Sequence, residues 1–160
     1  MEHRFIVDIN VGRLAKWLRV MGYDALLERE ADDAELVAEA QRQGRILLTR
    51  DSVLTQRKAI TSGQVRVVLV QYDDIWSQLR QVVDALDLDF SRGFSLCIEC
   101  NAPLEPRHKA ELQHRVPPYV YSTQQEFMEC PTCGKIYWRG THWRNMLKEL
   151  AKVKEVALGR

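Results

Sequence analysis

The sequence predicts an α/β fold with a doubly wound, mainly parallel sheet, followed by a small module that contains the cysteines. Short apolar runs alternate with amphipathic segments in the first part of the chain, as strands alternate with crossover helices in such sheets. After residue 92 the composition changes, because residues 94–141 hold all four cysteines and all five prolines. We therefore expect an α/β domain over residues 1–92 and a module over residues 93–160.

The first expected elements follow from hydrophobic periodicity. Residues 5–9 form an apolar run interrupted by Asp8, which predicts a strand, and residues 11–21 repeat apolar side chains at helical spacing. A short strand is expected near residues 25–27. Asp32 and Glu35 have the spacing of a capping box, so a helix is expected from about residue 33 to residue 43.

The remaining elements continue the alternation. Residues 45–49 form the continuous apolar run of a parallel strand that is covered on both faces. We expect a helix around residues 53–60, a strand at 65–70 and a helix at 75–86. Short strands and turns are expected over residues 94–141, and a closing helix beyond His142.

Composition and charge limit the function classes. No run approaches the length of a membrane helix and the N-terminus has no signal-peptide core, so we expect a cytoplasmic protein that does not enter membranes. The net charge is +1, but residues 1–96 carry 13 Lys and Arg against 15 Asp and Glu, whereas residues 97–160 carry 10 against 7. This local excess of positive charge favours a polyanionic partner.

The cysteines form two CxxC pairs, which a reducing compartment would keep as thiols. They are Cys97, Cys100, Cys130 and Cys133. Four thiolates in two such turns suit a tetrahedral Zn²⁺ ion, and a closed site of this kind is structural. The alternative is a redox CxxC motif, which would not need two copies. The spacing therefore predicts a zinc ribbon.

Three acids are expected at one edge of the sheet. Asp8 and Asp51 lie at the carboxyl ends of predicted strands, where open α/β sheets bind ligands, and Asp33 begins a helix that leads from the same edge. Such carboxylates could hold Mg²⁺ or Mn²⁺. The alternatives are a helix-dipole role for Asp33 and a helix cap for Asp51. Asp73 and Asp74 would add a fourth acid or form a turn.

Basic and aromatic residues are candidates for substrate contacts. Arg13, Lys16 and Arg19 follow one flank of the first predicted helix, and Arg50 lies beside Asp51. These cations could hold phosphates, or they could form an ordinary solvated face. In the cysteine module, residues 135–144 interleave aromatic and basic side chains, which is typical of single-strand binding or of a small ribbon core. The candidates there are Tyr137, Trp138 and His142.

These motifs together resemble a known family. Asp8 with residues 11–19, residues 45–51 and the two cysteine pairs, the second continuing to residue 138, resemble the Mut-seven C-terminal RNase family over nearly the whole chain. This resemblance implies a PIN-like nuclease fold with a fused zinc ribbon. It implies an active site on Asp8, Asp33 and Asp51, accompanied by Arg13, Thr49 and Arg50.

The sequence thus leads to the hypothesis of an endoribonuclease that depends on Mg²⁺ or Mn²⁺, with RNA as its partner and zinc as a structural ion. The second hypothesis is an RNA-binding or ribosome-associated adaptor that keeps the fold with weak or lost catalysis. A protein inhibitor is a further partner that the first hypothesis allows. A phospho-receiver domain would require adjacent acids at the first strand, where Asp8 stands alone.

Overall fold

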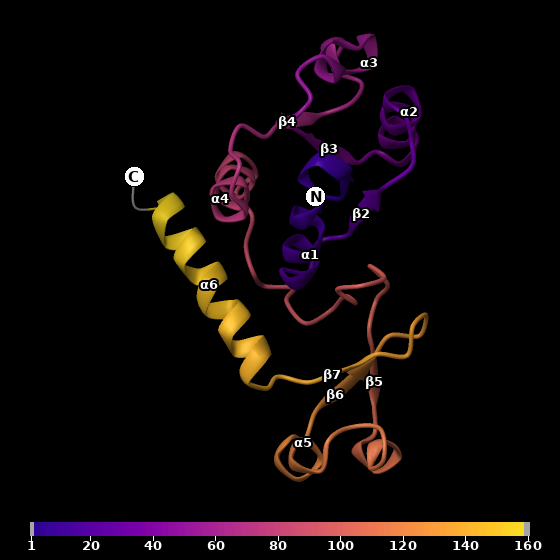
Figure 1. Ribbon diagram of the computed structural model, residues 1–160, viewed down its shortest axis with the longest axis vertical. Coiled ribbons are helices and arrows are strands. Elements are labelled where there is room, and N and C mark those ends of the chain that lie inside the picture. Colours follow the sequence, from indigo (N-terminus) through magenta and orange to yellow (C-terminus); the bar gives the residue numbers. More distant parts are fainter. Residues whose placement is uncertain (1, 159–160) are drawn as a thin grey trace.

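A four-stranded parallel sheet forms the centre of the computed structural model, which describes residues 2–158 (Figure 1). Its strands run in the order β2-β1-β3-β4, with bounds β1 Phe5–Asp8, β2 Ala25–Glu28, β3 Ile46–Thr49 and β4 Val67–Leu69. The strand order reverses between β1 and β3. Ligands of open α/β sheets bind outside the carboxyl ends at such a reversal.

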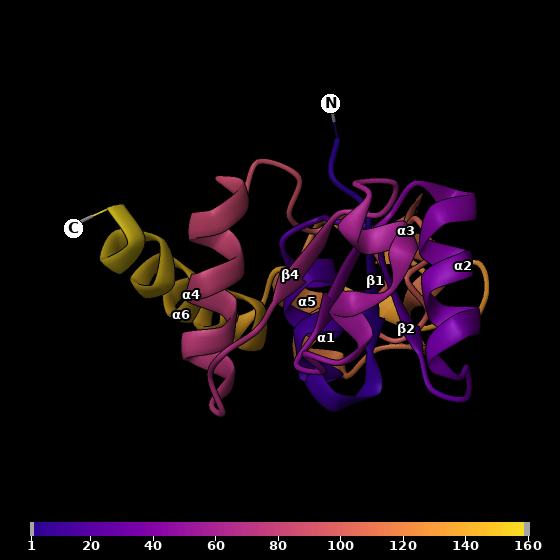
Figure 2. The same ribbon diagram turned by 90° about the horizontal axis from the view of Figure 1, so that it is seen from above.

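Helices cover both faces of this sheet, which confirms the predicted α/β fold class. On one face α1 (Arg13–Val20) and α4 (Ile75–Leu86) pack their apolar side chains against Val7 and Leu48. On the other face α2 (Asp33–Gln43) packs against Ile6 and Leu47. Figure 2 shows α2 and α4 on opposite sides of the strands. Alternate residues of each strand therefore enter two different cores.

The helix expected over residues 53–60 is interrupted. A short 3₁₀ turn, Leu54–Gln56, is followed by the one-turn helix α3, Lys58–Thr61, because Arg57 between them is extended. The side chain of Asp51 accepts hydrogen bonds from the backbone N–H groups of Val53 and Leu54, at 2.9 and 3.1 Å. This local bonding tightens the chain into a turn, as Asp side chains commonly do.

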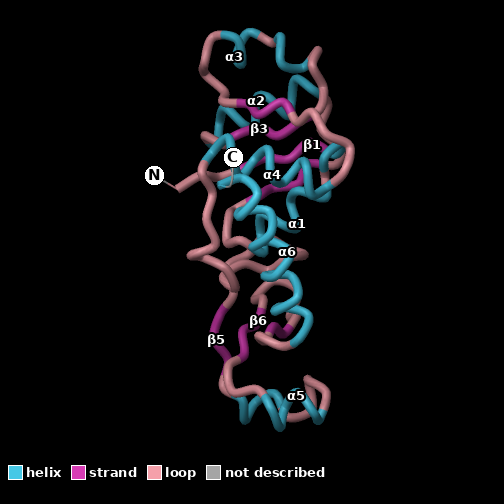
Figure 3. The backbone as a smooth tube through the Cα atoms, turned by 90° about the vertical axis from the view of Figure 1, so that its left-hand side faces the viewer, coloured by secondary structure: helices cyan, strands magenta, loops and turns pink. Residues whose placement is uncertain are grey.

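The cysteine module contains a second sheet and the closing helix. Its antiparallel strands are β5 (Glu105–Arg107), β6 (Phe127–Glu129) and β7 (Ile136–Tyr137), in the order β5-β6-β7. A 3₁₀ turn, Lys109–Leu112, and the short helix α5, Pro118–Thr123, precede β6 at the far end of the molecule (Figure 3). The closing helix α6, Thr141–Leu158, lies beside α4 (Figure 1). Within the described residues, none of the helices is apolar over a length that would cross a bilayer.

The largest core continues from the parallel sheet into the cysteine module. Trp143, Met146 and Leu150 of α6 belong to the same buried cluster as Leu79 and Val82 of α4. Phe94 lies edge-on against Trp143, with 5.0 Å between the ring centroids. Side chains on both sides of residue 92 are therefore desolvated together, while the division of the chain at residues 92 and 93 stays a prediction.

A chain of polar contacts joins residue 101 of the cysteine module to the parallel sheet. The buried guanidinium of Arg45 donates to Asp24 at 2.7 Å and to the carbonyl of Phe5 at 3.0 Å. The side chain of Asn101 donates to the same carboxylate at 2.6 Å and accepts from the N–H of Ala25 at 2.9 Å. Residue 101 is thus bonded to β2 and, through Asp24, to Arg45, which directly precedes β3.

Asp24 is the acid on which this chain of contacts depends. Burial raises its pKa, but the hydrogen bonds from Arg45 and Asn101 outweigh burial and leave the pKa below its ordinary value. A lowered pKa in the folded state stabilises the protein above the unfolded pKa, and this contribution is lost as the pH falls through the folded value.

We expect Asp24→Ala to lower the free energy of unfolding by roughly 2–3 kcal/mol at pH 7, because buried Arg45 would lose its carboxylate partner. Urea denaturation followed by circular dichroism measures this change. The deficit should shrink as the pH falls below about 3.9. The exposed Glu30→Ala should change stability by no more than about 0.5 kcal/mol. Equal effects of the two substitutions would contradict this assignment.

Candidate functional site

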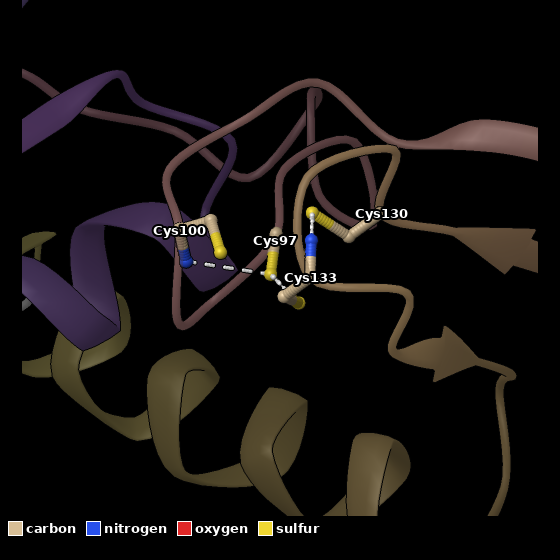
Figure 4. Close-up of side chains that lie close together, drawn as sticks. All are labelled: Cys97, Cys100, Cys130 and Cys133. Atoms are coloured by element: carbon tan, nitrogen blue, oxygen red, sulfur yellow. Dashed lines mark hydrogen bonds between the residues drawn. The ribbon is translucent and has the colours of Figure 1, made fainter.

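The four cysteines converge on one point (Figure 4). Their Sγ atoms all lie within 4.8 Å of one another, and those of Cys97 and Cys133 are 3.8 Å apart. Tetrahedral zinc with Zn–S bonds of about 2.3 Å places its sulfurs about 3.8 Å apart. The donor set and its spacing therefore fit a structural metal ion such as zinc.

Each CxxC turn directs a backbone amide at its own first sulfur. The N–H of Cys100 donates to Cys97 Sγ and the N–H of Cys133 donates to Cys130 Sγ, both at 3.4 Å. We call residues 97–101 the first cysteine turn and residues 130–134 the second. Amides that point at sulfur favour the thiolate, which is the form that binds metal.

The thiols also perturb one another when no cation neutralises them. Bonding to Cys133 and burial raise the pKa of Cys100 to about 12. Burial acts to raise the pKa of Cys130 as well, but hydrogen bonds from the amides of Cys133 and Thr132 lower it to about 7. Four thiolates so close together require a compensating positive charge, which a divalent ion supplies.

Two side chains outside the ligand set support the cysteine cluster. The hydroxyl of Tyr137 lies 3.1 Å from Cys97 Sγ and accepts from the N–H of Ile98 at 3.0 Å. Burial, followed by the bond to Cys97, raises the pKa of Tyr137. Arg19 is buried and donates to the carbonyls of Ile98 and Glu99 in the first cysteine turn, at 2.7 and 3.3 Å.

The basic and aromatic residues predicted to contact substrate fall into two groups, one buried and one at least partly exposed. Arg19 was expected along the exposed flank of α1, but it points inward to the first cysteine turn. Tyr137 is buried beside the cysteines. Trp138 is half-buried with its ring edge-on to Phe127, 6.3 Å between centroids, whereas His142 is exposed at the start of α6. His142 and Trp138 therefore offer surface to a ligand, and Tyr137 does not.

Asp8 and Asp51 are joined through Thr49 at the carboxyl edge of the parallel sheet. The fully buried hydroxyl of Thr49 donates to Asp8 Oδ2 at 2.8 Å and accepts from the backbone N–H of Asp51 at 3.0 Å. Asp8 ends β1 and Thr49 ends β3, so these contacts lie at the reversal of strand order. The chain brings these two acids to the edge where ligands of such sheets bind.

The remaining predicted acids have different surroundings. Asp33 opens α2 beside the N-cap Asp32, which accepts from the N–H of Glu35. Asp74 caps α4, and Asp73 forms an ion pair with Arg50 at 2.5 Å. Asp8, Asp33 and Asp51 have no ion pair within the described residues. Their carboxylates are thus left without a cation from the chain.

The three acids do not form a closed cluster. Among residues 2–158, the cysteines are the set of three or more potential ligands whose donor atoms all lie within 4.8 Å of one another. Glu28 was not singled out from the sequence, yet it pairs in register with Asp8 and therefore projects to the same side of the sheet. Its position directly at the end of a predicted strand was the signal that could have identified it.

Arg13 and Lys16 line an open groove of about 680 Å³ on the α1 side of the sheet. Both side chains are exposed, and neither has an acidic partner within the described part of the chain. The groove begins at Ile9 and Asn10, directly after Asp8, and ends at Ile98 and Glu99 of the first cysteine turn. It therefore connects the acidic edge with the cysteine site.

We expect the purified protein to contain about one zinc ion per chain, because four thiolates complete a tetrahedral site. Metal analysis by mass spectrometry measures this ratio. Removal of the ion by a strong chelator should lower the melting temperature, and added Zn²⁺ should restore it, since metal binding contributes to folding. Cys130→Ser protein should not respond to the chelator. A chelator-treated parent protein with an unchanged melting temperature would contradict a structural zinc.

Comparison with known proteins assigns the chain to a family. No curated protein and no solved structure matches it. The family model of the Mut7-C RNAse domain matches residues 3–150 of the 160-residue chain. This span includes the parallel sheet, both cysteine turns and the start of α6, and so the chain belongs to the Mut7-C RNAse domain family.

Proposed function

We propose that this protein is an endoribonuclease that uses Mg²⁺ or Mn²⁺ held by carboxylates. The observation that carries the proposal is the contact of Thr49 with Asp8 and with the backbone of Asp51, at the reversal of strand order. Membership in a family of RNase domains supports the choice of RNA as substrate. The structural zinc would be a separate ion with no part in the reaction.

The donor chemistry of the acidic edge suits a hard cation. One oxygen of Asp8 accepts from the hydroxyl of Thr49, and one oxygen of Asp51 accepts from two backbone N–H groups. These neutral donors orient the carboxylates without cancelling their charge. Asp8 and Asp51 would hold the ion, and Asp33 would complete its shell or orient the attacking water.

When bound, such an ion lowers the pKa of a coordinated water and stabilises the charge that develops on a phosphodiester. The chain itself would position the RNA. Arg13 and Lys16 would hold phosphates beside the edge, whereas Arg50, in the turn after β3, already pairs with Asp73 and would border the bound RNA. Trp138 and His142 are further candidate contacts in the cysteine module. Hydrolysis by water would leave a 5′-phosphate and a 3′-hydroxyl.

The open arrangement of the acids favours a second candidate function. Because Asp8, Asp33 and Asp51 do not all approach within 4.8 Å of one another, the second candidate is an RNA-binding or ribosome-associated adaptor with weak or no catalysis. Such an adaptor would keep the fold, the cysteine site and the basic groove. The two candidates differ in whether the acids bind a cation.

We expect Asp8→Asn to lower the rate of RNA cleavage at least about 100-fold, since it removes charge from the proposed cation site. The measurement is single-turnover cleavage of a labelled RNA in Mn²⁺, and EDTA should stop the parent reaction. Glu30→Gln, an exposed acid of the same edge, is the matched control and should retain activity. Full activity of folded Asp8→Asn protein would refute the proposed centre.

Calorimetric titration with Mn²⁺ separates the two candidates. The nuclease requires a binding event at the acidic edge, and Asp33→Ala should weaken it, because one carboxylate ligand is lost. The protein should be loaded with zinc beforehand so that the cysteines do not contribute heat. If the parent protein binds RNA but shows no Mn²⁺ site that responds to Asp33→Ala, the adaptor is the better description.

A further inference from the structure

Two grooves meet at Trp17. The first runs from the carboxyl edge of the sheet to the first cysteine turn, and Trp17 forms part of its wall. The second, also about 680 Å³, lies beside α6 and is lined by Trp17 and Trp76, together with His142 and Lys148 of α6. His142 also lines a third groove of about 440 Å³ that reaches Trp138 and Tyr119. Trp17 lines the first two hollows and His142 lines the second and third, so the three adjoin one another in a path from the sheet edge along α1 and α6 to the cysteine module.

An aromatic pair stands where the first two grooves join. The rings of Trp17 and Trp76 have centroids 4.8 Å apart and are inclined by 57°. Both side chains are half-buried, and Lys16 Nζ lies 5.5 Å from the centre of the Trp17 ring. Tryptophans that remain partly exposed beside a cation provide a surface on which a flat, unpaired base can stack.

Four exposed cations along this path are not neutralised by the protein. Arg13, Lys16 and Arg29 line the first groove and Lys148 lines the second, and all four are exposed. None of them has an ion pair within the described residues. They are therefore available to the phosphates of a bound polyanion.

The acids along the same path are already paired. The pairs are Asp73 with Arg50 at 2.5 Å, Glu99 with Lys135 at 3.8 Å, and Glu149 with Lys152 at 3.3 Å. Phosphates that enter the grooves would therefore meet acids whose negative charge is already compensated by an arginine or a lysine. The charges that remain unpaired along the path are consequently positive. They favour an anionic polymer over a neutral or a cationic ligand.

The sheet edge at the start of the path also exposes apolar side chains. Ile9, Val53 and Tyr72 follow β1, β3 and β4, with exposed fractions of 49%, 77% and 49%. Large apolar side chains at this exposure suit contact with base faces. A duplex would present only its backbone and its grooves to them, because paired bases are stacked on one another.

We propose that this path binds single-stranded RNA and guides it to the acidic edge. Trp17 and Trp76 stack on unpaired bases, while Arg13, Lys16 and Lys148 hold the phosphates between α1 and α6. The identity of the polymer rests on the proposed ribonuclease function. The single-stranded state and the route rest on the grooves, the tryptophan pair and the unpaired cations.

The test measures RNA affinity in Asp8→Asn protein, in which the proposed cleavage is blocked. A fluorescent 12-nucleotide oligouridylate and a blunt RNA duplex of the same length are compared by anisotropy. The single strand should bind at least about tenfold more tightly. Trp76→Leu should weaken single-strand binding at least about fivefold, whereas Trp76→Phe should largely retain it, because phenylalanine still stacks.

A pair of surface substitutions keeps the test independent of the core. Lys16→Ala with Lys148→Ala should reduce the slope of log affinity against log salt by about 1.4, from two lost phosphate contacts on a single strand. The matched control is Lys58→Ala with Arg66→Ala, two exposed cations away from the grooves. Unchanged affinity and slope in the lysine pair, or equal binding of the duplex, would overturn the proposal. A protein partner would then be the better occupant of the grooves.

Failure of this proposal differs from failure of the nuclease. If the parent protein binds the single strand, the groove substitutions weaken this binding, and no cleavage occurs, the proposed nuclease activity is refuted and the proposed RNA path is supported. The opposite outcome is that the parent protein cleaves RNA, and that Trp76→Leu and the substitution of both lysines change neither kcat/KM nor RNA affinity. This result would refute the proposed path but not the proposed nuclease activity.

Discussion

The buried guanidinium groups of Arg19 and Arg45 determine how the cysteine site sits on the parallel sheet. A buried cation is tolerated only where acceptors surround it, so each of these groups fixes the backbone that supplies those acceptors. Arg19 bonds the carbonyls of the first cysteine turn, and Arg45 holds Asp24, which in turn holds Asn101. The cysteine turn therefore joins the sheet through specific polar contacts as well as through the shared apolar core.

This attachment has a consequence for the surface. Ile98 and Glu99 form one end of the groove that starts after Asp8, and Arg19 bonds both of their carbonyls. An ion bound by the cysteines would thus stabilise a wall of the groove, although the cysteines themselves do not line the groove. The ion would affect the candidate substrate path by fixing the position of this backbone, and it would not need to take part in the chemistry.

The acidic edge obeys a different constraint. Thr49 is fully buried and must use its hydroxyl, which it does by donating to Asp8 and accepting from the N–H of Asp51. Neutral donors leave the carboxylates charged, in contrast to Asp24 and Asp73, whose charges are paired with arginines. The edge consequently keeps uncompensated negative charge beside a groove that keeps uncompensated positive charge. That juxtaposition suits a phosphate polymer and a divalent cation.

The sequence by itself determined the alternation of strands and helices, the limits of the helices at 33–43 and 75–86, and the grouping of the four cysteines, because periodicity, caps and CxxC spacing are local properties. It also predicted that Asp8 and Asp51 would share an edge, since parallel strands end together. Only the tertiary structure decided that Arg19 points inward, that Tyr137 serves the cysteine cluster, and that Trp17 meets Trp76. Those outcomes depend on contacts between segments far apart in the chain, whose burial and charge pairing no local pattern encodes.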